Sequence, residues 1–221
     1  MYKYINKLKE NTPIKDQLYF SLLNQDRMSF ETFKYSQVNF YKSVLKFSKP
    51  LFVLCSRIDN YEDRLKILEN ILDEHGNGNL KDTHGNTYKM YLNSLGIGDN
   101  KFPESYEHVS CSNFFSEVEK IVSLGNIDKA LAMYGIIEDR YTEISSFIAK
   151  IVLKNKWIDK ENLTHYSTHE KLDQYHAKLF YSIIEQRWKK EKSQDQIKKG
   201  LNIGNELVLR LFNDLLIKNH S

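Results

Sequence analysis

The stretch "HEKLDQYH" (residues 169–176) places two histidines and an aspartate at spacings of four and three residues. On a helix that advances about 100° per residue, His169, Asp173 and His176 fall within about 60° of one another. The apolar residues expected on the same side are Leu172, Phe180 and Ile183. Three ionisable groups on a buried face are costly unless they are paired or bind a cation. The stretch therefore predicts a helix whose inward face carries either hydrogen-bonded polar residues or a metal ion.

Apolar residues recur with the helical period along most of the chain, and no segment alternates for long enough to predict a strand. The predicted helices cover residues 14–24, 30–58, 61–74, 84–96, 103–124, 126–154, 162–192 and 195–217. Ser29 is expected to cap the second helix, and Pro50 is expected to kink or divide it. We therefore expect a single all-α bundle of about seven to eight helices over residues 1–221, with residues 1–13 as a flexible N-terminal extension.

The composition narrows the classes of protein that fit. With 9 Gly and 3 Pro among 221 residues, tight turns are few, which favours long helices. The formal net charge of +3 is spread along the chain, and no basic face interleaved with aromatic residues indicates a nucleic-acid partner. No window approaches 18 uncharged apolar residues, so we expect no membrane partner. Cys55 and Cys111 form no CxxC pair, which is typical of a reducing compartment, and we expect a cytoplasmic protein.

A carboxylate also lies among apolar positions in the predicted helix 126–154. Helical spacing places Glu138 on the core-facing stripe, whereas Asp139 and Arg140 are expected to rotate toward solvent. The other residues of this stripe are Leu131, Tyr134, Tyr141, Ser145 and Ile148. An isolated buried glutamate is ordinarily neutral or salt-bridged, and for Glu138 alone that interpretation stays open.

Two further ionisable residues stand on either side of the stretch "GNGN" (76–79). Glu74 shares the inner face of its predicted helix with Asn70, whereas Asp73 leaves that face by about 100°. His84 opens the following helix on the side that carries Tyr88 and Tyr91. Taken alone, Glu74 is equally consistent with an exposed carboxylate at a helix end, and His84 with a polar residue near a helix start.

Together these residues form a typical ligand supply for two metal ions. Four predicted helices direct three carboxylates and three imidazoles toward one interior. These residues are Glu74, His84, Glu138, His169, Asp173 and His176. Carboxylates can bridge two iron or manganese ions, and imidazole suits Fe(II). The Glu-x-x-His pair of ferritin-like bundles is absent, because no histidine here follows a glutamate by three residues, so a dimetal site in this bundle is of another kind.

Three motifs occur in an order that is known from one family. They are "DEHGNGNLKDTH" (73–84), "YGIIE" (134–138) and "HEKLDQYH". Over about residues 30–185 they resemble the haem-oxygenase-like dimetal oxidases, the group that includes the chlamydial death-domain-associating protein and relatives of pyrroloquinoline-quinone synthase C. Many of those relatives carry a proline four residues after the middle glutamate, where this chain has Thr142.

The resemblance implies that the same six residues bind metal and that Glu74, Glu138 and Asp173 take part in catalysis. It implies two metal ions, Fe/Fe or Fe/Mn, in an enzyme that activates O2 and oxidises a small organic substrate. Relatives act on fatty acids, on amino acids or amines, and one group consumes a tyrosine of its own chain. An electron donor and a homodimer remain open as partners. The side chains that are candidates for lining the substrate pocket are Gln37, Tyr41, Tyr88, Tyr91, Tyr134 and Tyr141. For each of them taken singly, packing between helices is an equally good interpretation.

Two other classes of function also fit the sequence. One is a cofactor-free oxidase or hydrolase of the same fold, in which the histidines act as general bases. The other is a non-enzymatic helical protein that binds a partner or haem. Metal stoichiometry distinguishes the dimetal interpretation from both.

Overall fold

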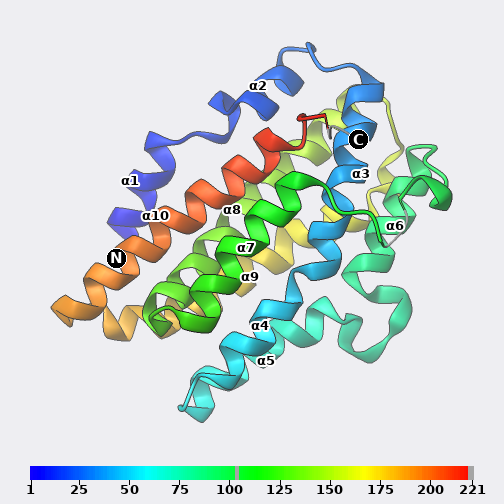
Figure 1. Ribbon diagram of the computed structural model, residues 1–221. Helices are drawn as coiled ribbons and strands as arrows, with labels where there is room; N and C mark the ends of the chain where they lie inside the picture. The colour runs from blue at the N-terminus through cyan, green and yellow to red at the C-terminus, as the bar shows by residue number, and fades with distance from the viewer. Residues whose placement is uncertain (103–104, 219–221) are drawn as a thin grey trace.

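The computed structural model describes residues 1–102 and 105–218, except for the side chains of residues 167–171 (Figure 1). The α-helices are α1 (Tyr2–Asn11), α2 (Leu18–Asn24), α3 (Phe30–Lys46), α4 (Ser48–Ser56), α5 (Tyr61–Glu74), α6 (His84–Ser94), α7 (Val109–Leu124), α8 (Ile127–Lys154), α9 (Thr164–Arg187) and α10 (Glu191–Asp214). Short 3-10 turns lie in several connections, and no strand occurs in the described part of the chain. The prediction of an all-α bundle is confirmed.

The number of helices slightly exceeds the predicted seven to eight for two reasons. The sequence did not predict α1, and the predicted helix 30–58 is divided into α3 and α4 at Phe47. Pro50 lies in the first turn of α4, where its missing amide hydrogen removes no helical hydrogen bond, so the division near this proline is confirmed. Ser29 caps α3 as predicted, because its hydroxyl oxygen accepts a hydrogen bond from the Thr32 amide at 3.1 Å.

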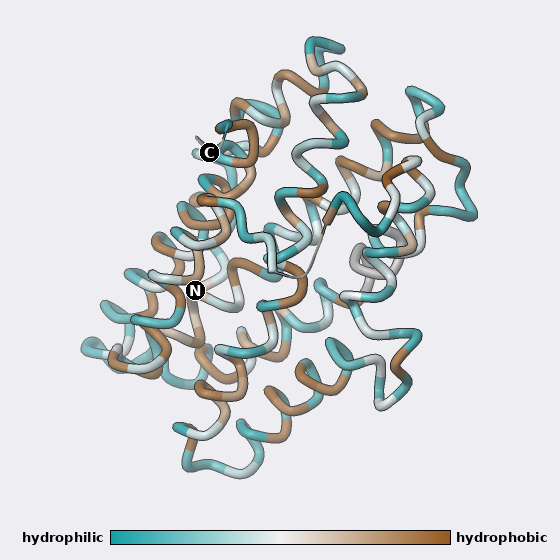
Figure 2. Tube along the Cα trace, turned by 45° about the vertical axis from the view of Figure 1, so that its right-hand side comes forward, coloured by the Kyte–Doolittle hydropathy of each residue, from teal (hydrophilic) through white to brown (hydrophobic). Residues whose placement is uncertain are grey.

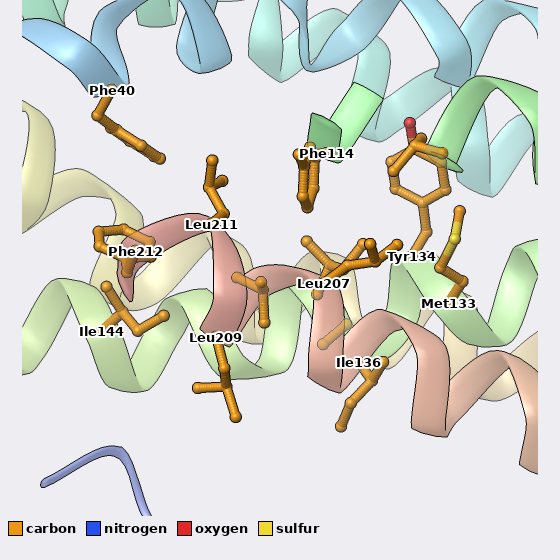
Figure 3. Packing of buried hydrophobic residues seen from close by; sticks show 14 of the residues in the cluster. Phe40, Phe114, Met133, Tyr134, Ile136, Ile144, Leu207, Leu209, Leu211 and Phe212 are labelled. Atoms are coloured by element: carbon orange, nitrogen blue, oxygen red, sulfur yellow. The ribbon is translucent and has the colours of Figure 1, made fainter. Parts of the chain in front are cut away.

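Helix α8 is the centre of the bundle and packs most extensively against α9 and α10 (Figure 1). The crossing with α10 is close, because an added Cβ on Gly204 would lie 2.5 Å from the carbonyl oxygen of Met133. A larger residue at position 204 would therefore push α10 away from α8. Figure 3 shows apolar side chains from several helices meeting beside this crossing, among them Phe40, Phe114, Ile136, Leu207, Leu211 and Phe212.

Polar and apolar residues alternate along the helices with the helical period. Figure 2 shows hydrophobic residues along the sides of helices that meet other helices, and hydrophilic residues along outer sides and connections. The buried apolar residues form one cluster that extends from Ile5 to Leu215. Within the described ranges, no helix combines the length and the apolar character needed to cross a bilayer.

The N-terminal segment forms α1, which packs on the bundle. Ile5 is buried, and the Lys9 ammonium lies 2.6 Å from the Asp139 carboxylate of α8. Arg140 was predicted to face solvent, but it is 1% exposed. The N-terminal segment covers it, and its guanidinium donates a hydrogen bond to the carbonyl oxygen of Thr12. The periodicity of α8 alone could not reveal this covering segment.

Helix α7 begins later than predicted. The proline expected to open it, Pro103, lies outside the described residues, and α7 starts at Val109. The imidazole of His108 caps the helix, because its Nδ1 accepts a hydrogen bond from the Ser110 amide at 3.3 Å. A histidine is not among the usual capping residues, which is why the sequence did not indicate this start.

Candidate metal centre

Glu74 and His84 are brought together by the glycine-rich loop between α5 and α6. Glu74 is the last residue of α5 and His84 is the first residue of α6. The Glu74 Oε1 and His84 Nδ1 atoms are 2.9 Å apart, and both side chains are buried. Gly76 has a φ of +60°, and an added Cβ there would lie 2.6 Å from the carbonyl carbon of Asp82. Only glycine fits this turn without strain, so Gly76 lets the loop fold back and join the two helix ends.

A second group comes from α8 and α9. Ligand atoms of Glu138, Asp173 and His176 all lie within 4.8 Å of one another, and all three residues are buried. The Asn70 side-chain amide of α5 donates a hydrogen bond to Glu138 Oε1 at 2.7 Å. The Nδ1 atom of His176 lies 4.0 Å from the same oxygen and has no hydrogen-bond partner among the described residues. A buried nitrogen without a partner is costly, and a metal ion between these groups would satisfy it.

The two groups face one interior. The predicted ligands that border a single cavity of about 50 Å³ are Glu74, His84, Glu138 and Asp173. His176 joins this set through its proximity to Glu138 and Asp173. The side chain of His169 lies outside the described residues, so its place as the sixth ligand stays a prediction. The structure thus brings together the five predicted ligands whose side chains it describes.

The electrostatics of this interior disfavour several negative charges at once. Burial is the main cause that raises the pKa of Glu138 to about 8; His176 opposes the rise, and Asp173 adds to it. Burial also raises the pKa of Asp173 well above its usual range, against the effect of His84. For His84, burial alone would lower the pKa, but the Glu74 carboxylate beside it raises the pKa overall. A bound cation would relieve this crowding of carboxylates.

The metal-free protein is expected to lose stability as the pH rises from about 4.5 to about 8. The carboxyl of Glu138 has a pKa of 4.5 when unperturbed and about 8 in the fold, so the folded state binds more protons in this window. The contribution of Glu138 to the free energy of unfolding is therefore fully present below the lower pKa and is lost as the pH rises through the upper one. The loss is at most on the order of 4 kcal/mol. Urea unfolding of the metal-free protein across this pH range measures the effect.

The control for this pH dependence is Glu138→Gln, which cannot ionise. The variant should show a flatter dependence of unfolding free energy on pH than the parent protein. Equal slopes in the two proteins would contradict the raised pKa of Glu138.

The donor set fits two iron or manganese ions. Glu74, Glu138 and Asp173 offer carboxylate oxygens that can bridge ions, and His84 and His176 offer imidazole nitrogens. All five side chains are at most 8% exposed. A dication buried there would lose its hydration shell, and the carboxylates would replace the water with negatively charged ligands. The buried His176 Nδ1, which has no described hydrogen-bond partner, is the observation that most directly supports a bound cation.

Among the predicted pocket residues, the structure places Tyr141 at the cavity, with its hydroxyl 3.2 Å from His165 Nε2. The predicted residues that are not among the cavity's lining are Gln37, Tyr41, Tyr88, Tyr91 and Tyr134. They are buried beside it. The Tyr88 hydroxyl donates a hydrogen bond to the backbone oxygen of Gln37 at 3.0 Å, and the Tyr166 hydroxyl donates one to the side-chain oxygen of Gln37 at 2.7 Å. Helical periodicity indicates which face of a helix a residue occupies, but not how close that residue lies to a cavity. The sequence therefore could not separate a residue that lines the cavity from one that is buried beside it.

The sequence did not single out most of the cavity wall. The apolar lining residues include Phe40, Val44, Phe47, Phe114, Phe115, Leu211 and Phe212. In the sequence they are indistinguishable from ordinary core residues, because the spacing of apolar residues is the same in a cavity wall and in a packed interior. His165 also borders the cavity and is 1% exposed. Its spacing of four residues from His169 was a signal for this position.

The structure thus combines an all-α bundle with a buried cluster of carboxylates and imidazoles that could hold a metal ion. The sequence profile of a family described as iron-containing redox enzymes matches residues 35–207, a range that includes all six predicted ligands. The chain belongs to this haem-oxygenase-like family, as its motifs predicted. None of the curated proteins matches the sequence.

Solved structures with the same fold are distant in sequence. A CADD-like protein of unknown function from Nostoc punctiforme has a TM-score of 0.80 and 15% identity, covering 97% of this chain and 95% of that one. A domain of unknown function with a heme oxygenase-like fold from Shewanella denitrificans has a TM-score of 0.75 and 14% identity, with 97% and 88% covered. A TenA family transcription regulator from Silicibacter has a TM-score of 0.74 and 13% identity, with 97% of each chain covered. These similarities establish the haem-oxygenase-like fold and do not assign an activity.

Proposed function

We propose that the protein is a non-haem dimetal oxidase or oxygenase that uses O2 to oxidise a small organic substrate. The observation that carries this proposal is the buried cluster of Glu138, Asp173 and His176, whose ligand atoms lie within 4.8 Å of one another beside the Glu74–His84 pair. Membership in a family of iron-containing redox enzymes supports iron as the metal. Such a cluster has a high energetic cost in an apolar interior unless it serves a cation.

The residues that would hold the two ions are the five described ligands together with His169. When bound, two ferrous ions supply electrons and Lewis acidity for the reduction of O2. The three carboxylates Glu74, Glu138 and Asp173 would offset most of the ions' positive charge in the low-dielectric interior. Asn70 holds the Glu138 carboxylate in a fixed direction through its 2.7 Å hydrogen bond. The chain thus contributes ligand geometry and charge balance before any substrate arrives.

The cavity limits what can approach the metal residues. Apart from those residues, its described lining is mostly aliphatic and aromatic and contains no lysine or arginine. The carboxylate of an amino acid or fatty acid would therefore find no cationic side chain in this lining. An apolar part of the substrate is the part that this wall would contact. A cavity of about 50 Å³ holds a few water-sized molecules. This volume suits a molecule as small as O2 and is far below that of a pocket for a drug-sized ligand.

Other side chains at the cavity would exclude water and hold a proton near a bound substrate. Phe114, Leu211 and Phe212 cover the metal residues with apolar surface, which excludes bulk water from the site. The hydroxyl of Tyr141 and the imidazole of His165 lie 3.2 Å apart at the cavity edge, so they can hold a proton close to a bound substrate. These groups are the described polar contacts available besides the predicted ligands and Ser43.

The first test is metal stoichiometry. Protein reconstituted with Fe(II) under anaerobic conditions should retain close to two ions per chain after desalting, because the ligands are numerous enough for two sites. Elemental analysis measures this number. Retention of a single ion would contradict a dimetal site, and retention of no Fe, Mn or Zn would favour a cofactor-free enzyme of the same fold or a non-enzymatic role.

A further inference from the structure

Asp73 contacts the metal-binding helix although it is not itself a predicted ligand. It is the next-to-last residue of α5, and its side chain is directed to α9, away from the face of Glu74. Its Oδ2 atom lies 3.0 Å from Nε2 of His176. The side chain of Asp73 is 17% exposed and that of His176 is fully buried, so the hydrogen bond is shielded from most of the solvent.

This contact determines which nitrogen of His176 carries the proton. A carboxylate only accepts hydrogen bonds, so Nε2 of the imidazole must donate. In the neutral imidazole, Nδ1 then carries a lone pair and no proton. That atom lies 4.0 Å from Glu138 Oε1 and has no hydrogen-bond partner in the described part of the chain. The lone pair is therefore available where the carboxylates converge.

The Asp73 carboxylate is itself fixed from the other side. The side-chain amide of Asn77 donates a hydrogen bond to Asp73 Oδ1 at 2.8 Å. Asn77 lies in the loop between α5 and α6 and has a φ of 51°, a left-handed conformation that asparagine tolerates better than most residues. The loop that joins Glu74 to His84 thus also orients the group that contacts His176.

We infer that Asp73 is a positioning residue that keeps His176 in the Nε2-protonated tautomer and presents its Nδ1 to the metal site. Carboxylates that hold a metal-bound histidine in this way fix the direction of the ring and increase its basicity, and their loss typically weakens metal affinity about 10- to 100-fold. The metal part of this inference rests on the proposed function. The tautomer part does not, because the hydrogen bond belongs to the chain alone.

The tautomer is measured in the metal-free protein with ¹⁵N-labelled histidine. The His176 signals are assigned by their loss in His176→Ala, and their nitrogen shifts report which ring atom is protonated. The parent protein should show the proton on Nε2. Asp73→Ala should shift the population toward the Nδ1 form. A parent protein protonated on Nδ1, or an unchanged tautomer in Asp73→Ala, would overturn the inference.

Metal affinity is measured by anaerobic competition between the protein and a chelator for Fe(II) or Co(II). Asp73→Ala should weaken one of the two sites about 10- to 100-fold. Asp73→Asn retains an oxygen that can accept from Nε2 but loses the charge, so it should recover part of that affinity. Equal affinities in Asp73→Ala and the parent protein would contradict a positioning role.

A matched control lies on the same two helices, next to His176 on α9 and one turn before Asp73 on α5. The hydroxyl of Tyr175 in α9 donates a hydrogen bond to Glu69 of α5 at 2.8 Å, and Tyr175 is exposed. Tyr175→Phe removes an α5–α9 hydrogen bond but keeps the ring whose centroid lies 6.3 Å from that of His176. Its metal affinities and its His176 tautomer should therefore match those of the parent protein. A loss in Tyr175→Phe as large as that in Asp73→Ala would mean that Asp73 acts only by holding the helices together. If the parent protein itself binds no metal, the proposed function fails, and the tautomer measurement still decides the role of Asp73.

Discussion

Replacement of His176 by alanine is expected to remove at least one metal ion per chain and to reduce O2 consumption to the uncatalysed background. His176 supplies the imidazole of the cluster with Glu138 and Asp173, and its loss leaves the two carboxylates without this ligand in a buried site. The helical content should survive, because α9 also packs through apolar residues such as Phe180 and Ile184. Elemental analysis, an oxygen electrode and circular dichroism measure the three outcomes.

The control for this experiment is Gln174→Ala, two residues away on the exposed side of α9. It should retain both metals and the O2 consumption of the parent protein. His169→Ala carries the same expectation as His176→Ala on the basis of the sequence motif. Unchanged metal content in both histidine variants would mean that the stretch 169–176 is structural.

The second large effect is expected at Glu138. Glu138→Ala should lower the occupancy of one metal site and abolish O2-dependent turnover, because it removes a fully enclosed carboxylate that faces Asp173 and His176. Two dications carry about four positive charges, and two or three anionic ligands are needed to offset them in a low-dielectric interior. The metal-to-protein ratio and the rate of O2 uptake measure the loss.

Asp139→Ala is the matched control, since it removes the neighbouring carboxylate on another face of α8. Asp139 accepts from Lys9 at 2.6 Å and from the Tyr181 hydroxyl at 3.0 Å, so its loss should lower the unfolding free energy by about 1 kcal/mol. Both metals should remain. If Asp139→Ala loses metal and Glu138→Ala keeps it, the assignment of the inner face of α8 is wrong.

Most of the helices were predictable, although α1 was not, because the signals that form them are local. The predicted helix 61–74 has the same bounds as α5, and its cap is a side-chain contact from Asn60 to the Asp63 amide at 2.9 Å. The break near Pro50 follows from the ring of a single residue. These signals act within a few positions of the chain, so they require no knowledge of the other helices.

The composition of the candidate site was predictable for a related reason. Helical geometry sets the angle between residues on one helix, so the sequence alone placed Glu138, Asp173 and His176 on inward faces. The structure brings these three side chains together, with Glu74 and His84 beside them. Their roles as metal ligands, like that of His169, stay predictions that metal analysis can test.

Which neighbour each side chain meets was decided only by the tertiary structure. The hydrogen bond between Asp73 and His176 joins residues 103 positions apart, and the periodicity of α5 indicated only that Asp73 leaves the face of Glu74. Arg140 is buried because the N-terminal segment lies over α8, a contact that the sequence of α8 does not contain. The phase of a helix sets the direction of a side chain, but the packing of whole helices against one another decides what lies in that direction. The sequence by itself therefore determined an all-α chain with inward ionisable residues, and the packing determined the cavity, the burial of Arg140 and the partner of His176.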